Sequence, residues 1–82
     1  MRLRVKMPKF GLTMTEGTIV EWRKAVGESV QAGEILLVVE TDKAEVEVEA
    51  PASGTLVEVI GEPKTVYPVG EVIAVMDAPG VG

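Results

Sequence analysis

The two halves of this 82-residue chain repeat each other, and this repeat limits the folds that the chain can adopt. The segment Gly17-Thr18-Ile19-Val20-Glu21 returns 37 residues later as Gly54-Thr55-Leu56-Val57-Glu58, and Gly33-Glu34 returns as Gly70-Glu71. Seven of the 24 positions that align without a gap are identical. A repeat of this length predicts one supersecondary unit used twice, and neither copy could bury its apolar face alone. We therefore expect the two copies to pack against each other.

Short β-strands are predicted along both copies. Glycine or proline interrupts most windows, and no stretch of 11 residues keeps a helical period. The strict alternation from Glu45 to Glu49 predicts a strand with Val46 and Val48 inward. Earlier in the chain we expect Val20 and Trp22 to point inward. The expected strands are 4–9 (at a sheet edge, because of Pro8), 17–24, a short strand at Val30, 35–41, 45–49, 55–60, 66–67 and 71–76.

The strands and the repeat together predict an all-β fold. Two small sheets related by a pseudo-two-fold axis would form a flattened β-barrel. Eighty-two residues suffice for one thin core but not for a deep catalytic cleft. We expect residues 1–77 to form the domain. Residues 78–82 begin with Ala78-Pro79-Gly80, which is typical of a flexible linker or tail.

A lysine is expected at the tip of a hairpin in the middle of the chain. Only Asp42, Lys43 and Ala44 separate the strand that ends near Thr41 from the strand that begins at Glu45. Spacing this short predicts a tight turn that holds the Lys43 amine in solvent, at one end of the long axis of the barrel. An ordinary solvated turn lysine is the alternative interpretation.

The neighbours of Lys43 decide which chemistry suits it. Acidic residues lie close to it in the sequence, at positions 40, 42, 45 and 47. This negative charge favours the protonated amine, whereas a nucleophilic lysine needs burial or nearby cations. Lys43 is therefore better suited as an attachment point, to which an external enzyme transfers an activated acyl group. The chemistry would then belong to the attached group.

The composition excludes several classes of function. The chain has neither cysteine nor histidine, so it offers no disulfide framework, no zinc-thiolate site and no histidine base. We expect no metal and no catalytic activity. The net charge is −5, and the segment from Glu28 to Glu62 has nine acids against one base, Lys43. Such a segment argues against nucleic-acid binding, which depends on neutralising phosphates. It fits either docking to basic partner proteins or a simple solvated face.

The sequence also bears on location. It has no apolar stretch of signal-peptide length and nothing close to the roughly 20 apolar residues of a membrane span. We expect no membrane association and an intracellular protein, cytoplasmic or, in a eukaryote, in the mitochondrial matrix.

Several segments resemble those of lipoyl domains, the swinging-arm carriers of 2-oxo acid dehydrogenase complexes, and in particular the N-terminal lipoyl domains of dihydrolipoamide acyltransferases. The resemblance covers about residues 5–77. The segments that carry it are Met7-Pro8-Lys9-Phe10-Gly11-Leu12-Thr13-Met14-Thr15-Glu16-Gly17, Val26-Gly27-Glu28-Ser29-Val30, Gly33-Glu34, Glu40-Thr41-Asp42-Lys43-Ala44, Ala50-Pro51-Ala52-Ser53-Gly54 and Val69-Gly70.

The resemblance implies a fold and a set of site residues. The fold would be a flattened barrel-sandwich of two four-stranded antiparallel sheets. Lys43 would carry lipoate in amide linkage, and Gly33 and Gly54 would be turn glycines on either side of it. Glu40, Asp42 and Ala44 are candidates for recognition by the attaching enzyme. Phe10, Gly11 and Leu12 would lie beside the hairpin and help a decarboxylase to recognise its carrier; alternatively, Phe10 and Leu12 pack the end of the barrel.

The resemblance also implies partners. A lipoate ligase or lipoyl transferase would attach the cofactor. A thiamine-dependent 2-oxo acid decarboxylase would acylate it, an acyltransferase core would pass the acyl group to coenzyme A, and a dihydrolipoyl dehydrogenase would restore the disulfide. We expect the isolated domain to be a monomer.

Two other readings remain open. Biotin carboxyl carrier domains are similar in fold but typically place methionine on both sides of their lysine, where this chain has Asp42 and Ala44. Unmodified barrels of this type serve as structural adaptors. One departure from the lipoyl pattern is Pro63-Lys64, where the family usually has a Gly-Asp turn. This departure concerns the shape of a distal turn rather than the attachment site.

Overall fold

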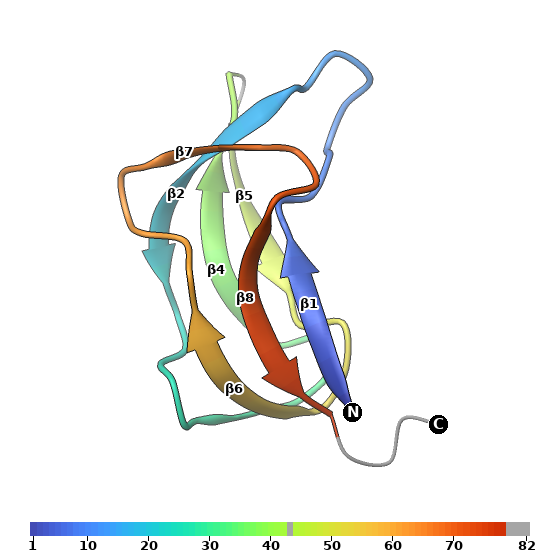
Figure 1. Ribbon diagram of the computed structural model, residues 1–82. Coiled ribbons are helices and arrows are strands. Elements are labelled where there is room, and N and C mark those ends of the chain that lie inside the picture. Colours follow the sequence, from blue (N-terminus) through green and yellow to red (C-terminus); the bar gives the residue numbers. More distant parts are fainter. Residues whose placement is uncertain (43, 79–82) are drawn as a thin grey trace.

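The computed structural model describes residues 1–42 and 44–78. Lys43, the expected attachment point, and residues 79–82 lie outside the described residues. The described part of the chain is entirely β and includes no helix that could span a membrane. Its eight strands are β1 (Arg2–Lys6), β2 (Glu16–Trp22), β3 (Ser29–Val30), β4 (Ile35–Glu40), β5 (Glu45–Glu49), β6 (Gly54–Val59), β7 (Val66–Pro68) and β8 (Val72–Asp77) (Figure 1).

The strands form two four-stranded antiparallel sheets, in the orders β1-β8-β6-β3 and β5-β4-β2-β7. Strands β2, β3 and β4 of the first copy correspond to β6, β7 and β8 of the second copy, 37 residues later. With β5 taken as the counterpart of β1, the two sheets then have the same order of equivalent strands. The expected flattened barrel of two four-stranded sheets is confirmed. The sequence did not predict that the copies exchange strands: β3 pairs with β6, and β7 pairs with β2.

The pseudo-symmetry extends to irregular features of the backbone. The ladder between β2 and β4 shifts register between Ile19 and Glu21, and the ladder between β6 and β8 shifts at the equivalent residues, Leu56 and Glu58. A β-bulge adds a residue to one strand and so reverses the face to which the following side chains point. Both copies therefore use the same bulge to wrap their strands around the core.

The bulge corrects one expectation about the core. Val20 was expected to point inward, but Ile19 is completely buried while Val20 is only half-buried. Trp22 lies beyond the bulge and still packs against the core, as expected. In β5 the alternation holds, because Val48 is buried, Val46 is half-buried and the glutamates are exposed. The largest fully buried side chains are Met7, Ile19, Leu36, Leu37, Leu56, Ile73, Met76 and Val39.

Most strand boundaries differ from the expected ones by one or two residues. The largest difference concerns the first strand, which was expected over 4–9 and is Arg2–Lys6. It lies at a sheet edge, as expected. Its ladder becomes irregular between Val5 and Lys6. Pro8, which has no N–H to donate, lies beyond its end.

The β4–β5 hairpin and the pair formed by Met1 and Ala78 lie at opposite ends of a molecule that measures 36 × 22 × 18 Å (Figure 1). At the terminal end the Ala78 amide donates a hydrogen bond to the Met1 carbonyl over 2.8 Å, and Ala78 is completely buried. Ala78 was expected to begin the tail, but these contacts make it part of the packed domain.

Candidate functional site

The hairpin between β4 and β5 is closed by its last described residues. The ladder ends with Glu40 opposite Glu45. Beyond this pair the Thr41 amide donates to the Ala44 carbonyl over 2.8 Å. Only positions 42 and 43 lie between Thr41 and Ala44 in the sequence. The connection is therefore as tight as the spacing predicted.

The Thr41 hydroxyl adds two bonds across the same turn. Its Oγ1 donates to the Ala44 carbonyl over 2.9 Å and accepts the Ala44 amide over 3.2 Å. Threonine and serine hydroxyls commonly stabilise turns in this way. Sequence reasoning missed this role, although a threonine at the end of a strand before a short turn was a usable signal. The hydroxyl fixes the two residues from which the tip projects.

Negative charge gathers around the tip. The side chains of Glu40, Asp42 and Glu45 are exposed, and Glu40 faces Glu45 directly across the ladder. Like charges in this arrangement repel each other. Among the described residues, no lysine or arginine forms an ion pair with these three carboxylates. The end of the molecule that carries the hairpin therefore attracts cationic groups.

The loop that follows β1 lies beside this hairpin. Phe10 and Gly11 line the same groove as Asp42 and Ala44. Leu12 is 95% exposed, so the alternative in which it packs the end of the barrel is wrong; Phe10 is 42% exposed. The loop is held by its own contacts, because the Met14 amide donates to the Gly11 carbonyl over 3.2 Å and the Phe10 amide donates to the Met14 sulfur over 3.3 Å.

Pseudo-symmetry shows that this loop is longer than its counterpart in the second copy. The amides of Gly33 and Gly70 donate to the carbonyls of Ala50 and Met7, which makes Met7 and Ala50 equivalent. A proline follows each of them. Eight residues then lead from Pro8 to β2 at Gly17, but the equivalent connection, between Pro51 and Gly54, has two. The six additional residues extend the surface beside the hairpin.

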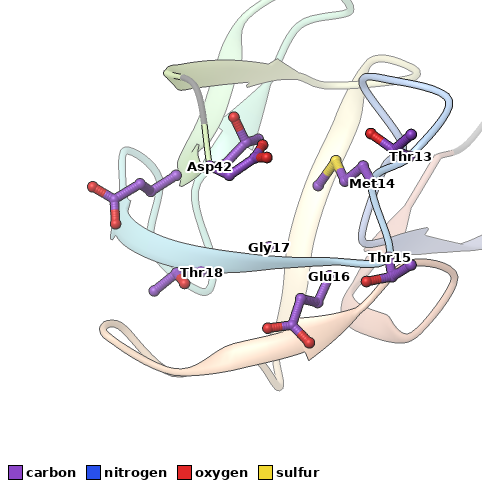
Figure 2. Close-up of a pocket in the computed structure, with 9 residues that line it drawn as sticks. Thr13, Met14, Thr15, Glu16, Gly17, Thr18 and Asp42 are labelled. Carbon is purple, nitrogen blue, oxygen red and sulfur yellow. The ribbon is translucent and has the colours of Figure 1, made fainter.

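Two grooves flank the connection. The larger has a volume of about 390 Å³ and runs between the hairpin and the segment from Thr13 to Thr18; Glu16, Glu40 and Asp42 give it an acidic lining (Figure 2). Figure 2 shows the side chain of Met14 pointing from the loop toward the hairpin that carries Asp42. The smaller groove, of about 220 Å³, lies between the loop and the start of β5.

The two glycines expected in turns have different structural roles. Gly33 lies in a turn with φ +89°, a conformation that glycine adopts without strain. Gly54 is instead the first residue of β6, so its expected place in a turn is corrected. A Cβ there would overlap the backbone oxygen of Asp77. Gly54 is thus required by the close approach of two backbones.

The unusual turn at Pro63-Lys64 keeps the geometry of its symmetry mate. Lys64 has φ +65°, and the equivalent residue in the first copy, Gly27, has φ +95°. The amides of Lys64 and Gly27 donate to equivalent carbonyls, those of Ile19 and Leu56. Lys64 therefore adopts a left-handed conformation that a residue with a Cβ rarely takes.

Comparison with known proteins gives this arrangement a family. The family model described as "Biotin-requiring enzyme", which covers biotin- and lipoyl-attachment domains, matches residues 3–76. The dihydrolipoyllysine-residue acetyltransferase component of the pyruvate dehydrogenase complex of Corynebacterium glutamicum is 47% identical over 70 residues, 85% of this chain and 10% of that protein. The corresponding component of the acetoin cleaving system of Pseudomonas putida is 46% identical over 70 residues, 85% of this chain and 19% of that protein.

A solved structure agrees with these relatives. The lipoyl domain of the 2-oxoglutarate dehydrogenase complex of Azotobacter vinelandii superposes with a TM-score of 0.78 and 31% identity, over 95% of this chain and 99% of that domain. The chain therefore belongs to the biotin- and lipoyl-attachment family and is a lipoyl domain, a non-catalytic carrier that takes lipoate covalently on a lysine. It spans about a tenth to a fifth of the length of the two curated relatives named above.

The described residues fit such a covalent group. The turn that contains position 43 is fixed by the Thr41–Ala44 bonds, so its neighbours are held in place. Asp42 and Ala44, on either side of that position, are both exposed. A group attached between them would begin at the surface, as a mobile arm requires.

Proposed function

We propose that Lys43 is the lipoyl attachment residue, and that the chain serves as the carrier domain of a dihydrolipoamide acyltransferase in a 2-oxo acid dehydrogenase complex. The observation that supports this most strongly is the closed two-residue connection between β4 and β5, with position 43 between two exposed neighbours. The domain would comprise residues 1–77, and Ala78, which packs against its end, would lead into a tether. We further propose that it acts in the cytoplasm, or in the mitochondrial matrix of a eukaryote.

The described residues have a positioning role in this function. When bound, lipoate supplies a disulfide ring that accepts an acyl group together with two electrons. Thr41 and Ala44 fix the base of the arm through three hydrogen bonds. The position of the hairpin at one end of the 36 Å axis leaves the arm room to enter the active site of another protein. Tethering then raises the effective concentration of the carried group near each partner.

Recognition by the attaching enzyme would use the residues beside the lysine. Glu40, Asp42 and Ala44 are all exposed on the closed hairpin and lie within three positions of Lys43. A lipoate ligase or lipoyl transferase could read this short acidic segment without contact with the rest of the domain. Complementary charge would increase its rate of encounter.

Recognition by a thiamine-dependent 2-oxo acid decarboxylase would use the surface loop. Phe10, Gly11 and Leu12 lie in the loop after β1, which is six residues longer than its counterpart and lies next to the hairpin. The exposed Leu12 side chain offers an apolar contact beside the acidic tip. The acyltransferase core and a dihydrolipoyl dehydrogenase would be the later partners of the same hairpin, and we expect the isolated domain to be a monomer.

Intact-mass measurement tests the attachment site. The chain is incubated with ATP, lipoate and a lipoate ligase, and in parallel with biotin and a biotin ligase. We expect one lipoyl amide, mapped to Lys43 by peptide fragmentation, and no biotin adduct. Lys43→Arg should fold and accept no lipoate, whereas Lys64→Arg, on the distal turn, should be modified like the unchanged chain. Lipoylation of Lys43→Arg, or modification by the biotin ligase alone, would contradict the proposal.

A further inference from the structure

The smaller groove lies between the surface loop and the hairpin, both of which have recognition roles in the function proposed above, but no role has yet been given to the groove itself. It has a volume of about 220 Å³ and separates the loop after β1 from the start of β5. Pockets that enclose drug-sized ligands usually measure about 300–1,000 Å³. This groove therefore suits one small ring or a short acyl chain. The residues that matter for the argument are Phe10, Met14, Asp42, Ala44 and Val46.

The walls of this groove are mainly apolar. Val46 is half-buried on β5, and Met14 and Phe10, which is 42% exposed, line the groove from the loop. Among the described residues that line it, Asp42 alone is acidic, whereas the larger groove has Glu16, Glu40 and Asp42. A neutral apolar group gains by leaving water for the smaller groove, because burial of apolar surface is favourable.

Two of the residues that line the groove are the sequence neighbours of position 43, so a group attached there could reach the groove. Asp42 and Ala44 both contribute to its lining, and in the sequence they are the neighbours of position 43 on either side. A group attached at that position is therefore joined to the chain between two residues that line the groove. The attached lipoyl group is neutral once its amide forms, and it ends in an apolar dithiolane ring. Sulfur makes favourable contacts with aromatic rings, and Phe10 is an aromatic residue that lines the groove.

We propose that this groove binds the dithiolane end of the lipoyl group on Lys43, as a resting position of the arm between visits to partner enzymes. This inference rests on the proposed attachment site and adds a second contact to it. Binding is weak because each immobilised flexible side chain loses conformational entropy. The ring therefore divides its time between the groove and solvent. Docking shields the ring from reagents in solution and is reversed when a partner binds.

The test uses an attachment that is independent of any ligase. The chain has no cysteine, so Lys43→Cys provides one thiol. Its thiolate displaces the halide of a haloacetamide whose alkyl chain ends in a dithiolane, and a thioether forms. We expect nuclear Overhauser effects between the ring protons and the side chains of Phe10, Met14 and Val46. Absence of these contacts in the labelled chain would overturn the proposal.

A chemical rate gives a second readout. A water-soluble phosphine reduces the ring to two thiols and is itself oxidised to the phosphine oxide with oxygen from water. We expect reduction about two- to five-fold slower in the labelled chain than in the same chain with Phe10→Ser and Val46→Thr, because only the undocked fraction reacts. Val26→Thr, a matched change at an exposed valine that does not line the groove, should leave the rate unchanged. Equal rates with and without the groove substitutions would overturn the proposal.

The two proposals fail in different ways. If the ligase does not modify Lys43 but the chemically attached ring contacts Phe10 and Val46, the attachment site is wrong and the groove binds dithiolanes. If the ligase modifies Lys43 but the attached ring shows neither contacts nor protection, the carrier function holds and the resting position does not exist.

Discussion

At the scale of single residues, the backbone conformation of Lys64 follows the internal repeat of the fold, although its residue type differs from that of its counterpart, Gly27. Its φ of +65° matches the +95° of Gly27 in the first copy. The conformation is imposed by the equivalent hydrogen bond from the Lys64 amide to the Ile19 carbonyl. A left-handed conformation costs a residue with a Cβ about 1–2 kcal/mol. The chain therefore carries local strain at a turn on the opposite copy from the hairpin.

Lys64→Gly should stabilise the domain. Glycine removes the left-handed strain, and part of the gain is lost to the larger entropy of the unfolded chain. We expect a net gain of about 0.5–1 kcal/mol, which raises the Tm of a domain of this size by about 2–8 °C. Lys64→Ala, which removes the charge but keeps the Cβ, should give no such gain. A Tm for Lys64→Gly at or below that of the unchanged chain, measured by thermal unfolding with circular dichroism, would contradict this explanation.

At the scale of elements, the contact between β6 and β8 depends on Gly54. Thr55 is paired with Asp77 in this ladder, and a Cβ at Gly54 would overlap the backbone oxygen of Asp77. Backbone atoms cannot move aside as the end of a flexible side chain can. Gly54→Ala must therefore separate the two strands or bend one of them.

We expect Gly54→Ala to lower the free energy of unfolding by about 2–4 kcal/mol, as overpacking of an interior does. Gly33→Ala meets no atom within 4 Å but keeps φ at +89°, so it should lose only about 1–2 kcal/mol. Gly11→Ala meets neither obstacle and should stay within about 0.5 kcal/mol of the unchanged chain. Urea unfolding of the three variants measures this order. Equal losses for Gly54→Ala and Gly11→Ala would contradict it.

The elements also show what the sequence could predict. The alternation of glutamate and valine in β5 gave both the strand and its buried face correctly, since period two is a direct signal of a half-buried strand. The same reasoning failed at Val20, because a bulge inserts one residue and changes the phase without a mark in the sequence. The partners of β3 and β7 could not be predicted, because strands of two and three residues carry no periodic signal.

The features of the candidate site likewise divide into those that the sequence could predict and those that it could not. The spacing of Thr41 and Glu45 predicted the tight connection because local chain geometry decides it. The position of Phe10 and Gly11 beside Ala44 came only from the family resemblance, since it depends on how distant segments pack. The hydroxyl bonds of Thr41 and the groove beside Val46 depend on atoms in three dimensions and appeared only in the structure.

At the scale of the whole molecule, the hairpin end and the terminal end have nearly the same structure. They differ in that the chain is continuous through the hairpin and is interrupted at the termini. At one end the Thr41 amide donates to Ala44, and at the other the Ala78 amide donates to Met1, both over 2.8 Å. The pairs β4–β5 and β8–β1 occupy the same place in their sheets. At the hairpin end the two strands are joined by a turn. At the terminal end the equivalent two strands carry the same hydrogen bond but are not joined. The fold itself would therefore accept a turn at either end.

A circular permutant tests this equivalence. A short Gly-Ser linker joins Ala78 to Met1, and new termini open between Leu12 and Thr13, in the long exposed loop after β1. We expect the permutant to fold within about 2 kcal/mol of the parent chain, because termini this close tolerate permutation. It should also accept lipoate on Lys43, because the attaching enzyme reads the closed hairpin. A control with the same linker, opened between Thr41 and Asp42, severs the connection and should not be lipoylated.

The comparison of these two permutants separates the scaffold from the site. Dispersed amide NMR spectra for both, with lipoylation of the first alone, would show that the sheets form without the connection and that attachment requires it. If the first permutant were unfolded, the loop after β1 would be part of the scaffold and not an addition to it. The proposed division of roles, with the sheets for stability, the hairpin for attachment and the loop for recognition, predicts that the first permutant folds and is modified but is acylated poorly by its decarboxylase.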